Sequence, residues 1–120
     1  MVAELPLVTG VSELVAAAGG TLYDATGSSG VVLESGLLGN KWQTTVINGR
    51  MILVNGVDAP RIYDGSTVTI GTYNATYPTE TLVPSKLVQV CQYKSRLYFV
   101  ERDSTNVWYG DTATITGNLA

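Results

Sequence analysis

The pattern of hydrophobic and polar positions divides the chain into short strands separated by turn residues. In its central stretch, 50–54 is an almost continuous apolar run, 55–60 is rich in turn residues, and 61–63 is apolar again. A short apolar run bounded by turn signals is typical of a strand buried on both faces. We therefore expect a strand, a loop and a second strand here, ended by Asp64-Gly65.

A hairpin signal immediately precedes this unit. Residues 41–47 alternate in character, with Trp42, Thr44 and Val46 on one face, and Asn48-Gly49 follows directly before 50–54. Asn-Gly suits a type I′ turn because both central residues of that turn need a positive φ. The sequence thus predicts that 41–47 and 50–54 pair as antiparallel strands.

Similar runs predict strands over most of the remaining chain, at 14–18, 21–23, 31–34, 66–70, 87–92, 96–101 and 107–109. The alanine-rich run at 14–18 also fits a helix, but Gly19-Gly20 closes it quickly, and we prefer a strand. The first residues, 1–12, are expected to form an N-terminal arm or an edge strand, since Pro6 does not suit a central strand.

Part of the pattern repeats along the chain. A shift of about 46 residues places 41–64 on 87–110 without gaps, so that Tyr63 meets Tyr109. A looser match at a spacing of about 40 places Leu22-Tyr23-Asp24 on the Ile-Tyr-Asp segment that contains Tyr63. Spacings of this size, with several short strands per repeat, are typical of β-propeller blades.

We therefore expect an all-β fold of antiparallel four-stranded blade-like repeats, forming a partial β-propeller. A β-sandwich is the alternative, because chance similarity between hairpins also produces an apparent repeat. A closed propeller needs about 4–8 blades, so further chain, further copies or a partner must cover the outer sheets. The expected division is an N-terminal arm (1–12), blade-like repeats over 13–111 (about 13–40, 41–85 and 86–111) and a C-terminal tail (112–120).

Large side chains occupy the matched strand positions, and we expect them to pack between the blades because aromatic residues bury the most area. These residues are Tyr23, Trp42, Leu53, Tyr63, Phe99, Trp108 and Tyr109. The alternative is a sugar-binding platform formed by Trp42, Tyr63, Tyr98, Trp108 and Tyr109. The long connection at 71–85 carries Tyr73 and Tyr77, which we expect to be freer and to contact a partner.

Composition and charge exclude several functions. Charged residues make up 14% of the chain, against about 25% in soluble domains. This fits either a surface partly hidden in an assembly or simply a β protein rich in Thr, Ser and Gly. The formal net charge is −3 and the seven lysine and arginine residues are scattered, so specific nucleic-acid binding is not expected. No apolar run is long enough to span a bilayer, and membrane insertion is not expected either.

Catalytic chemistry has no signature in this sequence. The chain lacks histidine, and the single cysteine, Cys91, lies in an apolar run where we expect a buried core thiol. Five aspartates lie at turns, where we expect them to cap backbone N–H groups: Asp24, Asp58, Asp64, Asp103 and Asp111. We therefore expect no enzyme activity, no catalytic residues, no cofactor and no metal site.

Two segments resemble a known class of proteins. Residues 55–66 read NGVDAPRIYDGS, and residues 94–101 read KSRLYFVE, followed by VWY at 107–109. Both are similar to segments of tailed-bacteriophage virion structural proteins that carry β-propeller-like repeats, such as tail hub or nozzle proteins. The similarity covers most of 13–109, although proteins of that class are usually several times longer.

The resemblance implies a structural component of a phage virion, in the tail or the head-tail connector assembly. Such a protein acts by protein–protein packing in a ring, has other virion proteins or its own copies as partners, and carries out no catalysis. It is made in the cytoplasm of the bacterial host and is located in the virion. The alternative function is that of a carbohydrate- or receptor-binding all-β module.

Overall fold

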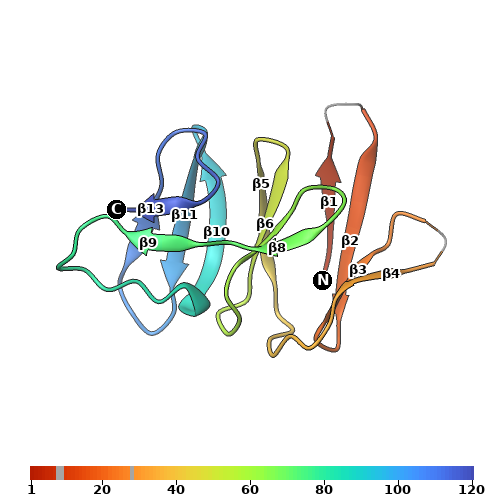
Figure 1. Cartoon of the computed structure of the whole chain (residues 1–120), viewed down its shortest axis with the longest axis horizontal. Helices are drawn as coiled ribbons and strands as arrows, with labels where there is room; N and C mark the ends of the chain where they lie inside the picture. Colours follow the sequence, from red (N-terminus) through yellow and green to blue (C-terminus); the bar gives the residue numbers. More distant parts are fainter. Residues whose placement is uncertain (8–9, 28) are drawn as a thin grey trace.

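The computed structural model describes residues 1–7, 10–27 and 29–120, which form a row of β-sheets standing side by side (Figure 1). The molecule is flat and elongated, with extents of 48 × 31 × 18 Å. In the described part of the chain, the only helical element is one 3-10 turn, Pro84–Lys86. The expectation of an all-β fold with antiparallel four-stranded sheets is confirmed.

Three antiparallel sheets follow one another in chain order, and each connects neighbouring strands by turns. The first sheet contains β1 (Val2–Pro6), β2 (Ser12–Ala18), β3 (Thr21–Asp24) and β4 (Val31–Glu34). The middle sheet contains β5 (Gln43–Ile47), β6 (Arg50–Val54), β7 (Arg61–Tyr63) and β8 (Val68–Ile70). The last sheet contains β10 (Leu87–Tyr93), β11 (Arg96–Glu101) and β12 (Val107–Tyr109).

Two strands lie in segments for which the sequence predicted no strand, and a third, β1, realises one of the two options given for residues 1–12. The segment expected as an N-terminal arm contains β1, which forms the edge of the first sheet beside β2. The long connection contains β9 (Tyr73–Ala75) and the polar tail contains β13 (Gly117–Leu119), and these two pair in parallel. A parallel pair joins segments far apart in the chain, so local patterns do not predict it.

The hairpin predicted at Asn48-Gly49 is confirmed. Ile47 pairs with Arg50, and the two turn residues have φ values of 51° and 74°, as a type I′ turn requires. The matching hairpin of the last sheet turns at Lys94 and Ser95, which also have positive φ.

Strand β6 is buried on both faces, which explains its continuous apolar sequence. Met51 and Leu53 join a core shared with the first sheet, whereas Ile52 and Val54 join a core shared with the last sheet. All four side chains have 0% exposure. Two hydrophobic cores therefore hold the three sheets together through the middle one.

The pairing of the third strand corrects the gap-free repeat. In the middle sheet Met51 pairs with Tyr63, but in the last sheet Tyr98 rather than Leu97 pairs with Tyr109. A one-residue change of register moves a side chain to the opposite face of a sheet. Tyr63 is consequently buried in the core shared with the first sheet, whereas Tyr109 points to the opposite side of its sheet and is 42% exposed. The loops before these strands differ in length, which shifts the register.

Gly20 is expected to be the least replaceable residue of the β2–β3 turn. Its φ is +78°, and an added Cβ would lie 2.5 Å from the carbonyl oxygen of Leu37. Gly19 has a φ of +56° but no atom near its Cβ position. We expect Gly20→Ala to lower the free energy of unfolding by about 2 kcal/mol and Gly19→Ala by about 1 kcal/mol. Urea titration of both variants measures the difference, and equal losses would contradict the contact with Leu37.

Candidate interaction surface

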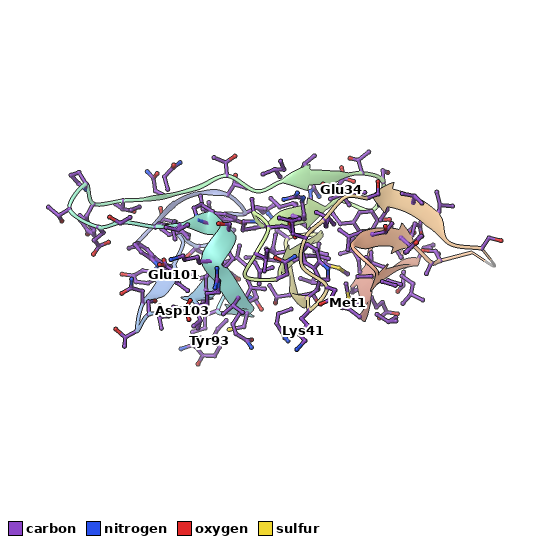
Figure 2. The ribbon with its side chains drawn as sticks, turned by 90° about the horizontal axis from the view of Figure 1, so that it is seen from below. Met1, Glu34, Lys41, Tyr93, Glu101 and Asp103 are labelled. Atoms are coloured by element: carbon purple, nitrogen blue, oxygen red, sulfur yellow. The ribbon has the colours of Figure 1, made fainter. Side chains whose placement is uncertain are left out.

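One face of the last sheet is covered by no other element of the described chain. The strand register places on this face, which we call the open face of the last sheet, the side chains of Gln89, Cys91, Tyr93, Arg96, Tyr98, Val100, Val107 and Tyr109. Tyr93 and Val107 are each 59% exposed, and Figure 2 shows Tyr93 projecting away from the ribbon. Most of these side chains also line an open hollow of about 470 Å³.

Apolar and aromatic groups dominate the chemistry of this face. The rings of Tyr98 and Tyr109 lie 6.1 Å apart, and the Lys94 ammonium lies 5.4 Å from the centre of the Tyr93 ring. The strand register places one charged side chain, Arg96, on this face, with Lys94 in the adjoining turn and Asp111 near Arg96. Such a surface suits burial against another protein, since aromatic residues supply most of the binding energy at interfaces.

Cys91 is exposed on this face, so the expectation of a buried core thiol is wrong. The side chains of β10 alternate between the two sides of the sheet, and the neighbouring Val90 takes the core-facing position. Because the chain has no histidine, no imidazole base stands beside the thiol.

The equivalent face of the middle sheet is covered by the last sheet. Ile52, Val54 and Ile62 point from the middle sheet into the core that it shares with the last sheet. By strand register, Tyr98 and Tyr109 of the last sheet correspond to Ile52 and Ile62. The same strand positions are therefore buried in the middle sheet and uncovered in the last sheet.

The outer face of the first sheet is also largely apolar and open. The register places on this face, which we call the open face of the first sheet, the side chains of Val2, Glu4, Leu14, Ala16, Ala18, Tyr23 and Val32. Val2 is 69% exposed and Val32 is 58% exposed. The opposite face of this sheet carries Val15 and Leu22, which are fully buried against the middle sheet. The row of sheets thus has an open apolar face at each end.

The loop between β6 and β7 holds the middle sheet to the chain segment that precedes it. The carboxylate of Asp58 accepts hydrogen bonds from the backbone N–H groups of Leu38 at 3.0 Å and Gly39 at 2.9 Å, and from the side chain of Asn55 at 2.7 Å. Burial alone would raise the pKa of Asp58, but these hydrogen bonds and the Arg61 charge outweigh it and hold the pKa below its usual value.

The same loop also contacts the last sheet. The N–H of Gly56 donates to the carbonyl oxygen of Leu87 at 3.0 Å, and the Gly56 carbonyl accepts a hydrogen bond from Nε of Arg102 at 2.7 Å. Residues 55–58 therefore tie the middle sheet to the last sheet and to the segment that connects the first and middle sheets. The expectation that turn aspartates cap backbone N–H groups is confirmed at Asp24, Asp58 and Asp64. The carboxylate of Asp103 instead accepts from the guanidinium of Arg102.

Buried charged groups in this protein are paired. The guanidinium of Arg61 donates to both carboxylate oxygens of Glu34, at 2.8 and 3.1 Å, and the indole N–H of Trp108 donates to Glu101 at 3.0 Å. Throughout the described residues, every buried side-chain nitrogen or oxygen has a hydrogen-bond partner. Nor do the described His, Cys, Asp and Glu side chains form a group of three or more that could hold a metal ion. These groups stabilise the fold and form no recognisable catalytic centre.

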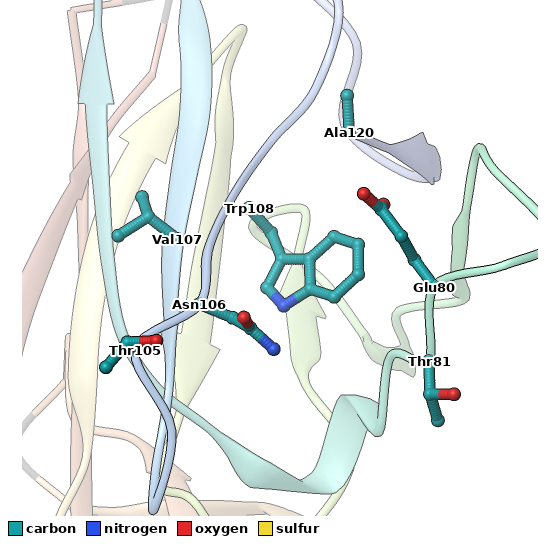
Figure 3. Close-up of a pocket in the computed structure, with 7 residues that line it drawn as sticks. All are labelled: Glu80, Thr81, Thr105, Asn106, Val107, Trp108 and Ala120. Carbon is teal, nitrogen blue, oxygen red and sulfur yellow. The ribbon is translucent and has the colours of Figure 1, made fainter.

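A second hollow, of about 380 Å³, lies along the outer edge of β12 (Figure 3). Figure 3 shows Glu80 across the hollow from Trp108, with Thr105 and Asn106 below the indole ring. Glu80 is the one charged side chain among the residues that line it. This arrangement can hydrogen-bond a small polar ligand beside an aromatic edge.

The residues expected to pack between repeats are distributed over both the cores and the open faces. Trp42, Leu53 and Tyr63 lie in the core of the first and middle sheets, and Phe99 and Trp108 lie in the core of the middle and last sheets. Tyr23 and Tyr109 instead lie on the two open faces. Burial, with the nearby charges of Asp24, Glu13 and Asp64, raises the pKa of Tyr63 to about 12, so its hydroxyl stays protonated and donates to the carbonyl of Gly65.

Tyr73, expected as a partner contact, lies in a core instead. Its ring packs edge-on against Phe99 at 5.0 Å, and its hydroxyl donates to the carbonyl of Ile115 at 2.7 Å. Burial raises the pKa of Tyr73 above its ordinary value. Of the two tyrosines, only Tyr77 is exposed, at 56%.

Most residues of the open face of the last sheet were missed from the sequence. The signal that could have found them is the alternation in β10 and β11, where every second residue belongs to the face opposite Val90 and Phe99. A search for membrane-spanning helices found no candidate among the described residues. Comparisons with models of protein families, with curated proteins and with solved structures found no match to this chain.

Proposed function

We propose that this protein is a structural assembly protein, which acts by packing its β-sheets against other protein subunits. The observation that carries the proposal is the open face of the last sheet. Its counterpart on the middle sheet is covered by another sheet of the same chain. Burying the exposed apolar groups at Tyr93, Val100 and Val107 is favourable at about 25 cal/mol per Å².

We also propose that the sheets are blades of a β-propeller-like arrangement. Support comes from the repeated antiparallel meander and from the packing of consecutive sheets through the two cores. The first strands of the middle and last sheets adjoin, since the N–H of Gln92 donates to the hydroxyl of Thr45 at 3.1 Å. Propeller blades likewise place their first strands together around an axis.

The setting that we propose is the virion of a tailed bacteriophage, in its tail or head-tail connector. This proposal rests on the resemblance of the segments 55–66 and 94–109 to virion proteins of that kind. The partners would be other virion proteins or further copies of the chain. The low charge content and the scattered cations agree with contacts to protein rather than to nucleic acid.

The thiol of Cys91 reports whether the open face becomes covered. We expect the purified protein to associate as its concentration rises, in sedimentation velocity, while its Cys91 reacts at least about tenfold more slowly with a thiol reagent. Val100→Asp places a carboxylate on the face and should weaken association at least about tenfold. Val57→Asp, in an exposed loop away from the face, is the matched control.

A protein that stays monomeric at millimolar concentration, with Cys91 equally reactive at every concentration, would argue against self-association. The structural role fails if, in addition, none of the purified virion proteins produced with it protects Cys91. A positive glycan array from the same monomer would favour the carbohydrate-binding function instead.

The hollow beside Trp108 is the specific observation in favour of that second candidate, a carbohydrate- or receptor-binding module. Polar side chains next to an indole edge are the usual chemistry of a sugar site. If a glycan binds there, Glu80→Ala and Asn106→Ala should each abolish the array signal. Unchanged binding in both variants would exclude this hollow as the site.

A further inference from the structure

We infer that the open face of the last sheet binds the open face of the first sheet of a second copy, so that copies join head to tail. This inference rests on the proposed assembly function and names its partner surface. Each open face would bind the open face at the other end of an identical chain.

The internal packing gives each sheet the same direction along the row. Leu22 points from the first sheet toward the middle sheet, as Ile62 points from the middle sheet toward the last. Tyr63 points back toward the first sheet, and Tyr23, its counterpart in the repeat, lies on the open face at the start of the row. Within the chain, one such interface joins the first and middle sheets, and a second joins the middle and last sheets. The open faces of the first and last sheets correspond to the two sides of this interface, but neither has a partner within the described chain.

Side-chain size is complementary between the two open faces. The last sheet presents the bulky rings of Tyr98 and Tyr109, whereas the first sheet has small side chains at Ala16 and Ala18. The larger side chains of Leu14 and Tyr23 border this shallow area on the same face. Large side chains facing small ones allow two sheets to approach and interdigitate at the density of a protein interior. Two faces of the last sheet placed together would instead oppose six tyrosines, namely Tyr93, Tyr98 and Tyr109 of each copy, with no small side chains between them.

Charge is complementary as well. The charged groups at the open face of the last sheet are Arg96 and the adjacent Lys94, with the carboxylate of Asp111 near Arg96, so this end of the face keeps a net positive charge. The open face of the first sheet contains Glu4, which is exposed, and no cation. Pairing of unlike faces brings opposite charges together, whereas pairing of like faces does not.

Such an interface is heterologous, because two different surfaces of the same chain meet in it. Each copy keeps one unmatched face after binding, so association continues beyond a dimer unless the row closes. A disruptive substitution on either open face should therefore stop self-association. A mixture of two variants, each with one disrupted face, should still form a dimer through the two intact faces.

The test uses two variants of the full chain, Ala16→Asp in the first sheet and Val100→Asp in the last. We expect each variant alone to be monomeric in sedimentation velocity at concentrations where the wild type associates. Mixed together, they should form a 1:1 dimer and nothing larger, because the mixture offers one intact face of each kind. Circular dichroism checks that both variants fold, and Val2→Asp and Tyr109→Asp, on the same faces, replace either one that does not.

Thiol labelling followed by mass spectrometry gives the direction of the contact. In the mixture, Cys91 of the Ala16→Asp copy should react at least about tenfold more slowly, while Cys91 of the Val100→Asp copy keeps its monomer rate. A dimer of Ala16→Asp alone, with its Cys91 protected, would overturn head-to-tail binding in favour of paired last sheets and leave the assembly function standing. A wild-type protein that neither associates nor protects Cys91 would overturn the head-to-tail contact, and self-association with it.

Discussion

Replacing Phe99 by alanine is expected to lower the free energy of unfolding by about 3–5 kcal/mol, the range for an aromatic residue deleted from a core. Phe99 is fully buried between the middle and last sheets and packs against the ring of Tyr73 at 5.0 Å. The deletion leaves a cavity beside Tyr73, whose hydroxyl remains anchored to Ile115, so the site cannot collapse easily. Urea or guanidinium titration followed by circular dichroism measures the loss.

The adjacent residue on the same strand provides the control. Val100 points to the open face and is 39% exposed, so Val100→Ala should change the stability of the monomer by no more than about 0.5 kcal/mol. The same substitution should weaken association, because it removes apolar area from the proposed interface. Equal losses of monomer stability at Phe99 and Val100 would mean that the last sheet is covered on both faces, contrary to the structure.

Asp58→Ala is expected to lower the free energy of unfolding by about 3 kcal/mol. The substitution removes a charged acceptor that receives hydrogen bonds from Leu38, Gly39 and Asn55, and it leaves partly buried donors without a partner. Asp64→Ala is the matched control, since Asp64 accepts only from the neighbouring Ser66 and Thr67 at an exposed turn and should cost about 1 kcal/mol. Similar losses for both would show that the connection through Asp58 does not hold the sheets together.

The pH dependence of stability gives a second measure of Asp58. Its pKa is lower in the folded protein than the ordinary aspartate value of about 3.9, so its contribution to stability is fully present above that value. The contribution disappears as the pH falls through the lower pKa of the folded state. Stability of the wild type should therefore fall more steeply below about pH 4 than that of Asp58→Ala. Parallel curves for the two proteins would contradict the depressed pKa.

Strands and turns were largely predictable because their causes are local. The run 50–54 has the continuous apolar pattern of a doubly buried strand, and Asn48-Gly49 has the residues that a type I′ turn needs. The aspartates that cap turns were likewise readable, since each caps a backbone N–H within three residues at Asp24 and Asp64. Even β1 was foreseen as one of two options, because proline is tolerated at a sheet edge.

The sequence did not predict which face of its sheet each side chain occupies. Tyr63 and Tyr109 share a place in the repeat but lie on opposite sides of their sheets, because the strand pairing of the last sheet differs by one residue. Cys91 was expected in the core and lies on the open face, since its apolar neighbours do not reveal which alternate residues point inward. Tyr73 is buried because β9 pairs with β13, a contact between distant segments that leaves no local signal.

The sequence by itself determined an all-β chain of short antiparallel strands, because hydrophobic alternation and turn chemistry act over a few residues. Only the tertiary structure decided which faces are covered, because that depends on strand register and on the stacking of whole sheets. The middle sheet is buried on both sides, while Tyr98 and Val100 at one end of the row and Ala16 and Tyr23 at the other remain open. These two open faces, rather than any single motif, form the candidate functional surface of the protein.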